Sequence, residues 1–233
     1  MATYIISDIH GEYEKLIQLL EKISFSEQDT LYVLGDVLDR GPNPIKVLLK
    51  MMEMPNIIPI AGNHEMMGLA CLRFLMKEVT DENISELTEK MLELLREWQK
   101  NGSDTTMAEF LKLDKNARED IIEYIEEFST YEEVTINGTS YVLVHAGLGN
   151  FALDKPLYEY TLEELMWERA DYEKTYFKDC YVITGHTPTQ NIKNNPKPGY
   201  IYQTHNHIAI DCGACFGGRL AAYCLDTGEE FYV

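Results

Sequence analysis

Residues 31–41, LYVLGDVLDRG, contain the pattern that decides the fold. The apolar run 31–34 predicts a buried strand, and polar residues follow it beside glycine. Apolar residues at helical spacing come next, in 45–52. The same order of strand, polar loop and helix begins at Tyr4, and a third apolar run, 57–60, ends in AGNHE. Layered α/β folds place their sites where strands end, so we expect the site there.

The middle of the chain differs from the rest in composition and pattern. From about residue 66 to 130 glycine is rare, glutamate and leucine are plentiful, and Leu87, Met91, Leu94 and Trp98 recur with a helical period. These residues predict a helical insertion that caps the site. A binding surface for a basic partner is the alternative interpretation of the same acidic segment.

Further strands are predicted after the insertion. Asn137-Gly138 lies between two apolar runs, and this pair is typical of a type I′ hairpin turn because both residues tolerate positive φ. Apolar runs at 181–184, 208–210 and 220–225 and the end of the chain, 230–233, predict closing strands. We therefore expect residues 1–233 to form a single domain with an inserted helical segment.

Composition excludes several classes of function. The chain has 233 residues with 45% hydrophobic and 25% charged content, which is typical of one globular domain. Its net charge of −19 argues against nucleic acid or anionic membranes as partners, because both are normally bound through basic patches. No apolar run approaches the ~18 residues of a membrane span, and no secretory signal begins the chain. We expect a cytoplasmic protein with reduced thiols.

Six side chains of the type that binds metals follow the predicted strands. They are Asp8, His10, Asp36, Asn63, His145 and His186. Mixed oxygen and imidazole ligands suit borderline divalent ions, manganese first, with iron, zinc, cobalt or nickel as alternatives. The set predicts two metal ions bridged by Asp36, the first bound by Asp8 and His10 and the second by Asn63, His145 and His186.

Each of these residues has an ordinary interpretation when it is taken alone. An aspartate after a strand is usually a turn or helix cap, and a buried histidine is usually a core residue with its hydrogen bonds made. Five short motifs that follow one another at the predicted strand ends make a shared functional site the better interpretation. They are DIHG, GDVLDRG, GNHE, HAG and GHTP, starting at residues 8, 35, 62, 145 and 185.

With these motifs, which span residues 7–188, the sequence resembles a calcineurin-like metallophosphoesterase, and within that group a small bacterial phosphoprotein phosphatase (PPP-type serine/threonine protein phosphatase). The resemblance implies a four-layer α/β/β/α sandwich of two mixed sheets with a helical cap insertion. One departure is Ser7, where the family usually has glycine. Ser7 removes no ligand.

Two further residues are assigned a catalytic role. Asn63 and His64 are adjacent, so in an extended or loop backbone one can bind metal while the other faces the substrate. Asp39 can then hydrogen-bond His64 and favour its protonated form. The matching residues of the resembled family form such an Asp–His acid dyad. Arg40 provides a fork that suits phosphate oxygens, and Arg169 resembles the second phosphate-binding arginine of the family.

The predicted activity is metal-dependent hydrolysis of phosphoserine and phosphothreonine, and sometimes phosphotyrosine, in a phosphoprotein or phosphopeptide. A hydroxide that bridges the metals would attack phosphorus, Arg40, Arg169 and Asn63 would hold the phosphate oxygens, and His64 would protonate the leaving oxygen. One alternative is a dinucleoside polyphosphate hydrolase of the diadenosine tetraphosphate type, whose relatives commonly lack the aspartate at position 39. The non-enzymatic alternative is a metal-dependent interaction module.

Overall fold

The computed structural model describes residues 1–76 and 89–233. Its first sheet has five strands in the order β10-β9-β1-β2-β3. These are β1 (Thr3–Ile6), β2 (Thr30–Leu34), β3 (Ile57–Ile60), β9 (Ala221–Cys224) and β10 (Glu230–Tyr232). β1, β2 and β3 are parallel, and β9 and β10 add antiparallel pairings at the other edge. The carboxyl ends of the three parallel strands therefore meet along one edge.

The second sheet also has five strands, in the order β4-β5-β6-β8-β7. These are β4 (Tyr131–Ile136), β5 (Thr139–Val144), β6 (Cys180–Thr184), β7 (Tyr202–Thr204) and β8 (His207–Ala209). Asn137 and Gly138 have φ of 51° and 82°, so the predicted hairpin between β4 and β5 is confirmed. The short edge strand β7 was not predicted.

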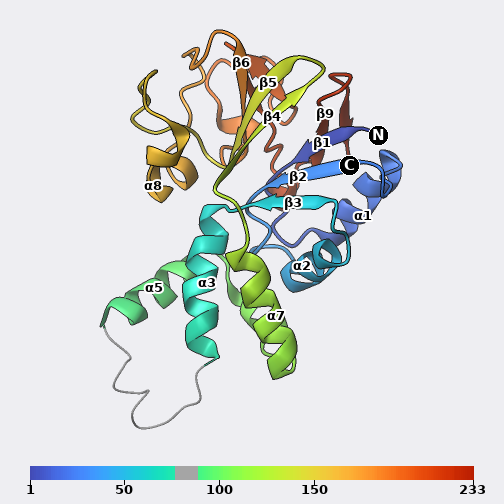
Figure 1. The fold of residues 1–233 in the computed structure, drawn as a ribbon. Coiled ribbons are helices and arrows are strands. Elements are labelled where there is room, and N and C mark those ends of the chain that lie inside the picture. Colours follow the sequence, from blue (N-terminus) through green and yellow to red (C-terminus); the bar gives the residue numbers. More distant parts are fainter. Residues whose placement is uncertain (77–88) are drawn as a thin grey trace.

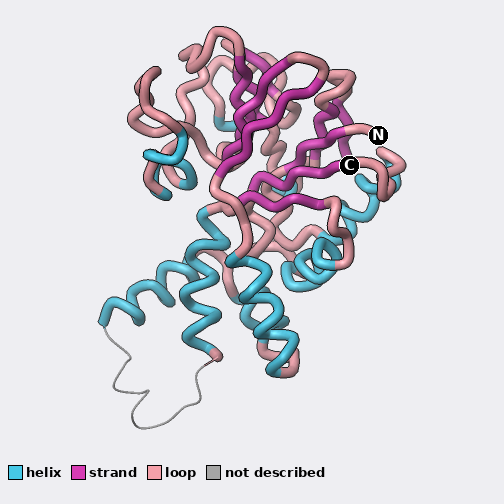
Figure 2. Tube along the Cα trace, viewed as in Figure 1, coloured by secondary structure: helices cyan, strands magenta, loops and turns pink. Residues whose placement is uncertain are grey.

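The two sheets pack face to face, as Figures 1 and 2 show. Their shared core contains Ile5 and Leu34 of the first sheet and Leu143, Ile183 and Ile208 of the second, all of them buried. Burying one such side chain stabilises the fold by about 1.5–3 kcal/mol. The predicted α/β fold with two mixed sheets is confirmed.

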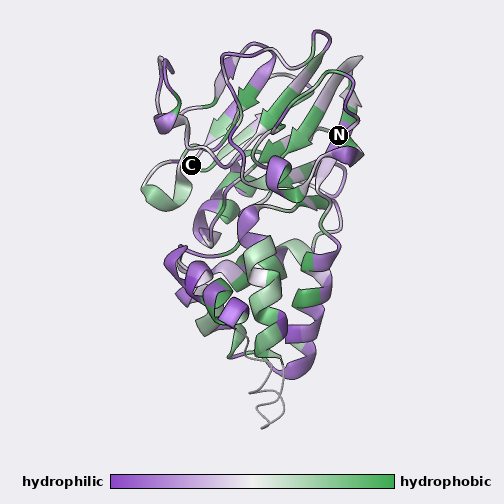
Figure 3. Cartoon of the chain, turned by 90° about the vertical axis from the view of Figure 1, so that its left-hand side faces the viewer, coloured by the Kyte–Doolittle hydropathy of each residue, from purple (hydrophilic) through white to green (hydrophobic). Residues whose placement is uncertain are grey.

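Helices cover the outer face of the first sheet and extend below it (Figure 1). They are α1 (Tyr13–Lys22), α2 (Pro44–Met52), α3 (Asn63–Leu75), α5 (Glu89–Lys100), α6 (Asp104–Phe110) and α7 (Lys115–Glu126). α5 and α7 pack against α3, and α6 packs against α2. Hydrophobic residues line the contacts between these helices (Figure 3), with Trp98, Phe110 and Ile121 fully buried. The predicted helical position Leu87 lies outside the described residues.

A thinner layer covers the outer face of the second sheet. It contains the short helix α8 (Leu162–Met166) and the 3₁₀ turn η1 (Leu157–Glu159). A second 3₁₀ turn, η2 (Thr189–Asn191), follows β6. Leu165 and Met166 are buried in the same core cluster as Val144 and Val182 of the sheet. Among the helices of the described residues, none is both long and apolar enough to cross a bilayer.

Candidate metal centre

The loops that follow the strands hold unusual backbone conformations. Non-glycine residues with positive φ include six from the predicted site, namely Asp8, His10, Asp36, Asp39, Arg40 and His186, with φ between 44° and 69°. Such conformations cost of order 1–3 kcal/mol each and persist only where the surrounding structure holds them. The site is therefore a place where the fold maintains local strain.

Glu65 supports one of these loops. Its buried carboxylate accepts hydrogen bonds from the backbone N–H groups of Asp36 (2.7 Å), Val37 (2.8 Å) and Leu38 (3.1 Å). It also accepts from the N–H of Gly62 (2.9 Å), which precedes α3. This role of Glu65 was not predicted, although glutamate at the third position of a helix is a known N-terminal signal.

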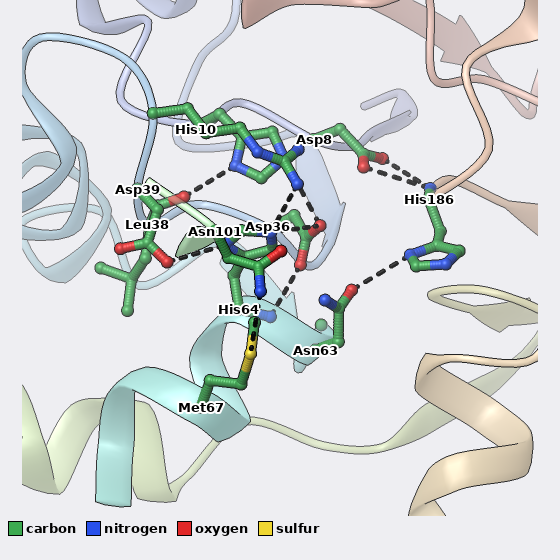
Figure 4. A network of polar contacts seen from close by, with 12 residues as sticks. Asp8, His10, Asp36, Leu38, Asp39, Asn63, His64, Met67, Asn101 and His186 are labelled. Atoms are coloured by element: carbon green, nitrogen blue, oxygen red, sulfur yellow. Dashed lines mark hydrogen bonds and ion pairs between the residues drawn. The ribbon is translucent and has the colours of Figure 1, made fainter. Parts of the chain in front are cut away.

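Asp36 lies at the centre of the predicted ligands (Figure 4). Its Oδ2 is 3.4 Å from Nε2 of His10, and its Oδ1 is 3.4 Å from Nε2 of His145. Two groups of potential ligand atoms share this carboxylate: one with His10 and His64, the other with His145 and His186. A shared carboxylate is the geometry expected of a bridging ligand.

The imidazole tautomers leave lone pairs directed at Asp36. Nδ1 of His10 donates to the carbonyl of Leu38 and Nδ1 of His145 donates to the carbonyl of Leu34, both at 2.7 Å. Nε2 is then the acceptor nitrogen of both rings. Burial lowers the pKa of His10 well below its usual range, with further lowering from the charges of His64 and Arg40. A neutral imidazole with an unprotonated Nε2 suits metal binding.

Asn63 and His186 each bring a further potential ligand atom to Nε2 of His145. Oδ1 of Asn63 is 3.1 Å from Nε2 of His145 and 3.0 Å from Nδ1 of His186, and these two nitrogens are 3.2 Å apart. Burial, followed by the charges of His145 and Arg169, lowers the pKa of His186 to about 3. One amide oxygen and two imidazole nitrogens this close together form a donor set that fits a divalent metal.

Asp8 joins the site from β1. Its carboxylate accepts from the backbone N–H of His186, at 3.2 and 2.9 Å for the two oxygens. Burial raises its pKa well above the usual range, and the nearby carboxylates of Asp211 and Asp36 raise it further. A crowded group of buried carboxylates favours a bound cation.

Asp211 was missed by the sequence analysis. It is buried and lines the same cleft as Asp36 and His186. Burial raises its pKa to about 7, with a further increase from Asp36 and an opposing hydrogen bond from the N–H of Gly213. Its position after β8, followed closely by glycine, repeats the pattern of the other site residues and was the signal available in the sequence.

His64 makes a different set of contacts from the other histidines. Its Nδ1 lies 2.7 Å from Oδ2 of Asp39, so Nδ1–H donates, and its Nε2 points toward Arg40 and Asp36. Burial lowers the pKa of His64, but Asp36 and the hydrogen bond to Asp39 outweigh it, and the net pKa is raised. Asn63 and His64 are the first two residues of helix α3, and the expected extended or loop backbone was wrong. The side chains still diverge because successive helical residues lie about 100° apart.

The two arginines lie at the same cleft. The Arg40 guanidinium contacts Nε2 of His10 (2.5 Å) and Nε2 of His64 (2.8 Å), and it lies 5.3 Å from the ring of Phe216. Arg169 and Trp167 line the same cleft as Arg40. Met67, Glu97 and Asn101, from the helices, complete its wall.

Comparisons with known proteins agree with this geometry. The model of the calcineurin-like phosphoesterase family matches residues 1–209. Over 94% of its length the chain is 27% identical to serine/threonine-protein phosphatase 2 of Escherichia coli (strain K12), of which it covers 91%. Over 94% of its length it is also 26% identical to the bis(5'-nucleosyl)-tetraphosphatase PrpE (asymmetrical) of Halalkalibacterium halodurans, of which it covers 87%.

Solved structures share the fold. One, described provisionally as a diadenosine tetraphosphatase, superposes with a TM-score of 0.65 at 20% identity, with 99% of this chain and 92% of that chain covered. A metallophosphoesterase from Sphaerobacter thermophilus superposes with a TM-score of 0.56 at 17% identity, with 100% and 88% covered. With the family model matched along most of its length and its site motifs gathered around Asp36, this chain belongs to the calcineurin-like phosphoesterase family.

Proposed function

We propose that this protein hydrolyses phosphate monoesters of serine and threonine, and also of tyrosine, in phosphoproteins. The observation that carries the proposal is the contact of 2.7 Å between His64 and Asp39 beside the candidate metal centre. This pair provides a general acid where the leaving group of a phosphate monoester would stand. We further propose that residues 1–233 act as one catalytic domain, with the inserted helices forming part of the cleft.

The calcineurin-like phosphoesterase family uses a dimetal centre, and the donor atoms described above fit one. The residues that would hold the ions are Asp8, His10, Asp36, Asn63, His145 and His186. Manganese is the favoured ion. When bound, the pair supplies Lewis acidity toward phosphate and lowers the pKa of a nucleophilic water.

Arg40, Arg169 and Asn63 bind the phosphate in this proposal. The net charge of the chain is −19, but a phosphate in the cleft is within reach of two guanidinium groups. Coulomb energy depends on distance, and charges beyond about 10 Å are screened by salt, so the nearby arginines outweigh the distant acidic surface. Both guanidiniums can donate paired hydrogen bonds to phosphate oxygens.

His64 supplies the proton that the leaving oxygen needs. Asp39 holds Nδ1–H, so Nε2, which contacts Arg40 in the structure, is the nitrogen that would carry the transferred proton once Arg40 turns to the phosphate. An alkoxide is a poor leaving group, and general acid catalysis contributes about 10²–10⁴ in rate for such a step. A nucleoside phosphate departs without protonation, so a tetraphosphatase has less use for the pair.

The alternative function is hydrolysis of dinucleoside polyphosphates. Several relatives are named bis(5'-nucleosyl)-tetraphosphatases, including one from Baumannia cicadellinicola that is 39% identical over 42% of this chain. The presence of Asp39 supports the monoester activity over this alternative. A metal-dependent interaction module is the non-enzymatic alternative.

A substrate panel separates these functions. The manganese-loaded protein is assayed with phosphoserine, phosphothreonine and phosphotyrosine peptides and with diadenosine tetraphosphate. We expect kcat/KM at least tenfold higher for a phosphopeptide than for the dinucleotide. A preference for the dinucleotide would establish the alternative, and no turnover of any substrate would favour the interaction module.

The role of His64 is tested with His64→Asn on two leaving groups. We expect a fall of at least 100-fold on the phosphoserine peptide and less than tenfold on nitrophenyl phosphate, whose phenolate departs unaided. Equal losses on both substrates would remove the acid role.

A further inference from the structure

We propose that the corner between α5 and α6, formed by Trp98, Gly102 and Thr106, is the element that positions the acid pair and Arg40. The inference rests on the proposed function, because it assigns a role to residues that act through Asp39 and His64. It gives the inserted helices a part in the chemistry in addition to their part in the cleft wall.

Asp39 is held by three side chains, two of which come from the insertion. Oδ2 accepts from Nδ1 of His64 and from Nε1 of Trp98, at 2.7 and 2.9 Å. Oδ1 accepts from the hydroxyl of Thr106 at 2.6 Å. Asp39, His64, Trp98 and Thr106 are all fully buried. With both oxygens engaged, the carboxylate cannot turn away from His64 without leaving buried donors unpaired.

The same corner holds the backbone of this loop. The N–H of Asp39 donates to the Thr106 hydroxyl at 3.0 Å, and the N–H of Arg40 donates to the carbonyl of Gly102 at 2.8 Å. Asp39 and Arg40 are consecutive residues with φ of 69° and 66°. Two left-handed non-glycine residues in succession need external support, and the insertion provides a partner for each N–H.

Gly102 makes this close approach possible. It has φ of 97°, and a Cβ there would lie 3.0 Å from Cγ and 3.3 Å from Cα of Arg40. The corner is therefore shaped to the Asp39–Arg40 backbone. In this arrangement Trp98 and Thr106 are positioning residues, because both are fully buried and act by holding Asp39.

A purely structural role for Thr106 predicts a different outcome from a positioning role. Thr106→Val keeps the shape of the side chain but removes the hydroxyl, and Thr106→Ser keeps the hydroxyl. The matched control is Ile121→Val, which shortens a fully buried side chain of α7 and leaves the hydrogen bonds of Asp39 in place. Unfolding curves of all variants confirm that each is folded. Trp98→Phe removes the indole N–H that donates to Asp39. This variant replaces Thr106→Val in the test if Thr106→Val does not fold.

The kinetic test compares leaving groups with the manganese-loaded protein. We expect Thr106→Val and Trp98→Phe to lower kcat at least tenfold on a phosphoserine peptide and less than threefold on nitrophenyl phosphate, with KM changed less than threefold. Thr106→Ser and Ile121→Val should stay within threefold of the wild type on both substrates. Equal losses on both leaving groups, or no loss in Thr106→Val, would overturn the proposal.

A second measurement does not depend on turnover. In protein labelled with ¹⁵N-histidine, the hydrogen-bonded Nδ1–H of His64 is identified by its absence in His64→Asn. We expect this proton signal in the wild type and in Thr106→Ser, and its loss or upfield shift in Thr106→Val. An unchanged signal in Thr106→Val would count against positioning.

Failure of this inference differs from failure of the proposed function. If His64→Asn shows the leaving-group difference and Thr106→Val does not, only the positioning role is wrong. If His64→Asn lowers both rates equally, the acid role itself is wrong.

Discussion

Asp8 and His186 lie 178 positions apart in the sequence, yet the backbone N–H of His186 donates to both carboxylate oxygens of Asp8. Asp8 follows β1 of the first sheet, and His186 follows β6 of the second. The contact therefore ties the two sheets together at the edge where the candidate ligands gather (Figure 4). Changes that disturb this edge should affect metal binding before they unfold the protein.

Gly185→Ala tests this contact directly. A Cβ at position 185 would overlap Oδ2 of Asp8 and lie 2.7 Å from Oγ of Ser7. We expect manganese affinity to fall at least tenfold and stability to fall by about 1–3 kcal/mol, because the crowded side chains must move. Titration calorimetry and denaturant unfolding measure the two effects. Gly138→Ala, in an open hairpin turn, is the control and should lower stability without changing metal affinity.

Asp36→Asn tests the shared ligand. Because Asp36 lies between His10 and His145, we expect manganese affinity to fall at least 100-fold and activity to fall at least 10³-fold while the chain remains folded. Bound metal per chain and circular dichroism are the measurements. Asp154→Asn, an exposed position, should behave as the wild type. A variant that keeps both metals and its activity would contradict the assignment.

Glu65→Gln tests the support of the Asp36 loop. Glutamine replaces one acceptor oxygen with a donor, although four backbone N–H groups point at this carboxylate. We expect a loss of about 2–4 kcal/mol in the free energy of unfolding, measured with urea, together with weaker manganese binding. Glu21→Gln, at an exposed position, should change stability by no more than about 0.5 kcal/mol. An unchanged urea midpoint in Glu65→Gln would show that the carboxylate is dispensable.

His207 should make stability depend on pH. Its ring is buried, Nε2 contacts the hydroxyl of Thr184 at 2.8 Å, and Nδ1 has no hydrogen-bond partner among residues 1–76 and 89–233. Burial lowers its pKa to about 3, below the usual value near 6.5. Between these values the unfolded chain binds a proton that the folded chain does not, so stability is lost as pH falls below 6.5.

The magnitude follows from the same linkage. The loss is about 1.4 kcal/mol per pH unit, or about 2 kcal/mol between pH 6.5 and 5. Urea unfolding at several pH values should show this extra loss in the wild type and its absence in His207→Gln. His205→Gln is the control, because His205 is exposed and should leave the slope unchanged. Parallel stability curves for the wild type and His207→Gln would contradict this prediction.

The local hydrophobic pattern of the sequence was sufficient to predict most of the strands and the hairpin. β1, β2 and β3 lie within one residue of the apolar runs in the sequence, and the Asn137-Gly138 turn has the expected positive φ values. These features depend on side-chain periodicity and on the backbone freedom of a few residues. β7 escaped prediction because a three-residue edge strand has too little pattern of its own.

The order of the motifs was also sufficient to predict which side chains are candidate metal ligands, because the strand ends of a layered sheet converge. The partners of those side chains were not predictable in the same way. Glu65 accepts hydrogen bonds from three backbone groups of another loop. Asp211 lies near Asp8 only because the two sheets pack on each other. Trp98 and Thr106 contact Asp39 although they are 59 and 67 positions away in the sequence.

The sequence by itself determined which residues of this protein can carry charge, bind metal and end a strand, because these are properties of side chains and of short runs. Tertiary structure alone decided which buried donors face Asp39, which carboxylates crowd together and which imidazole nitrogen donates to a carboxylate or carbonyl. The physical reason is that hydrogen-bond direction and electrostatic coupling depend on distances of a few ångströms, which only the packing of distant segments determines.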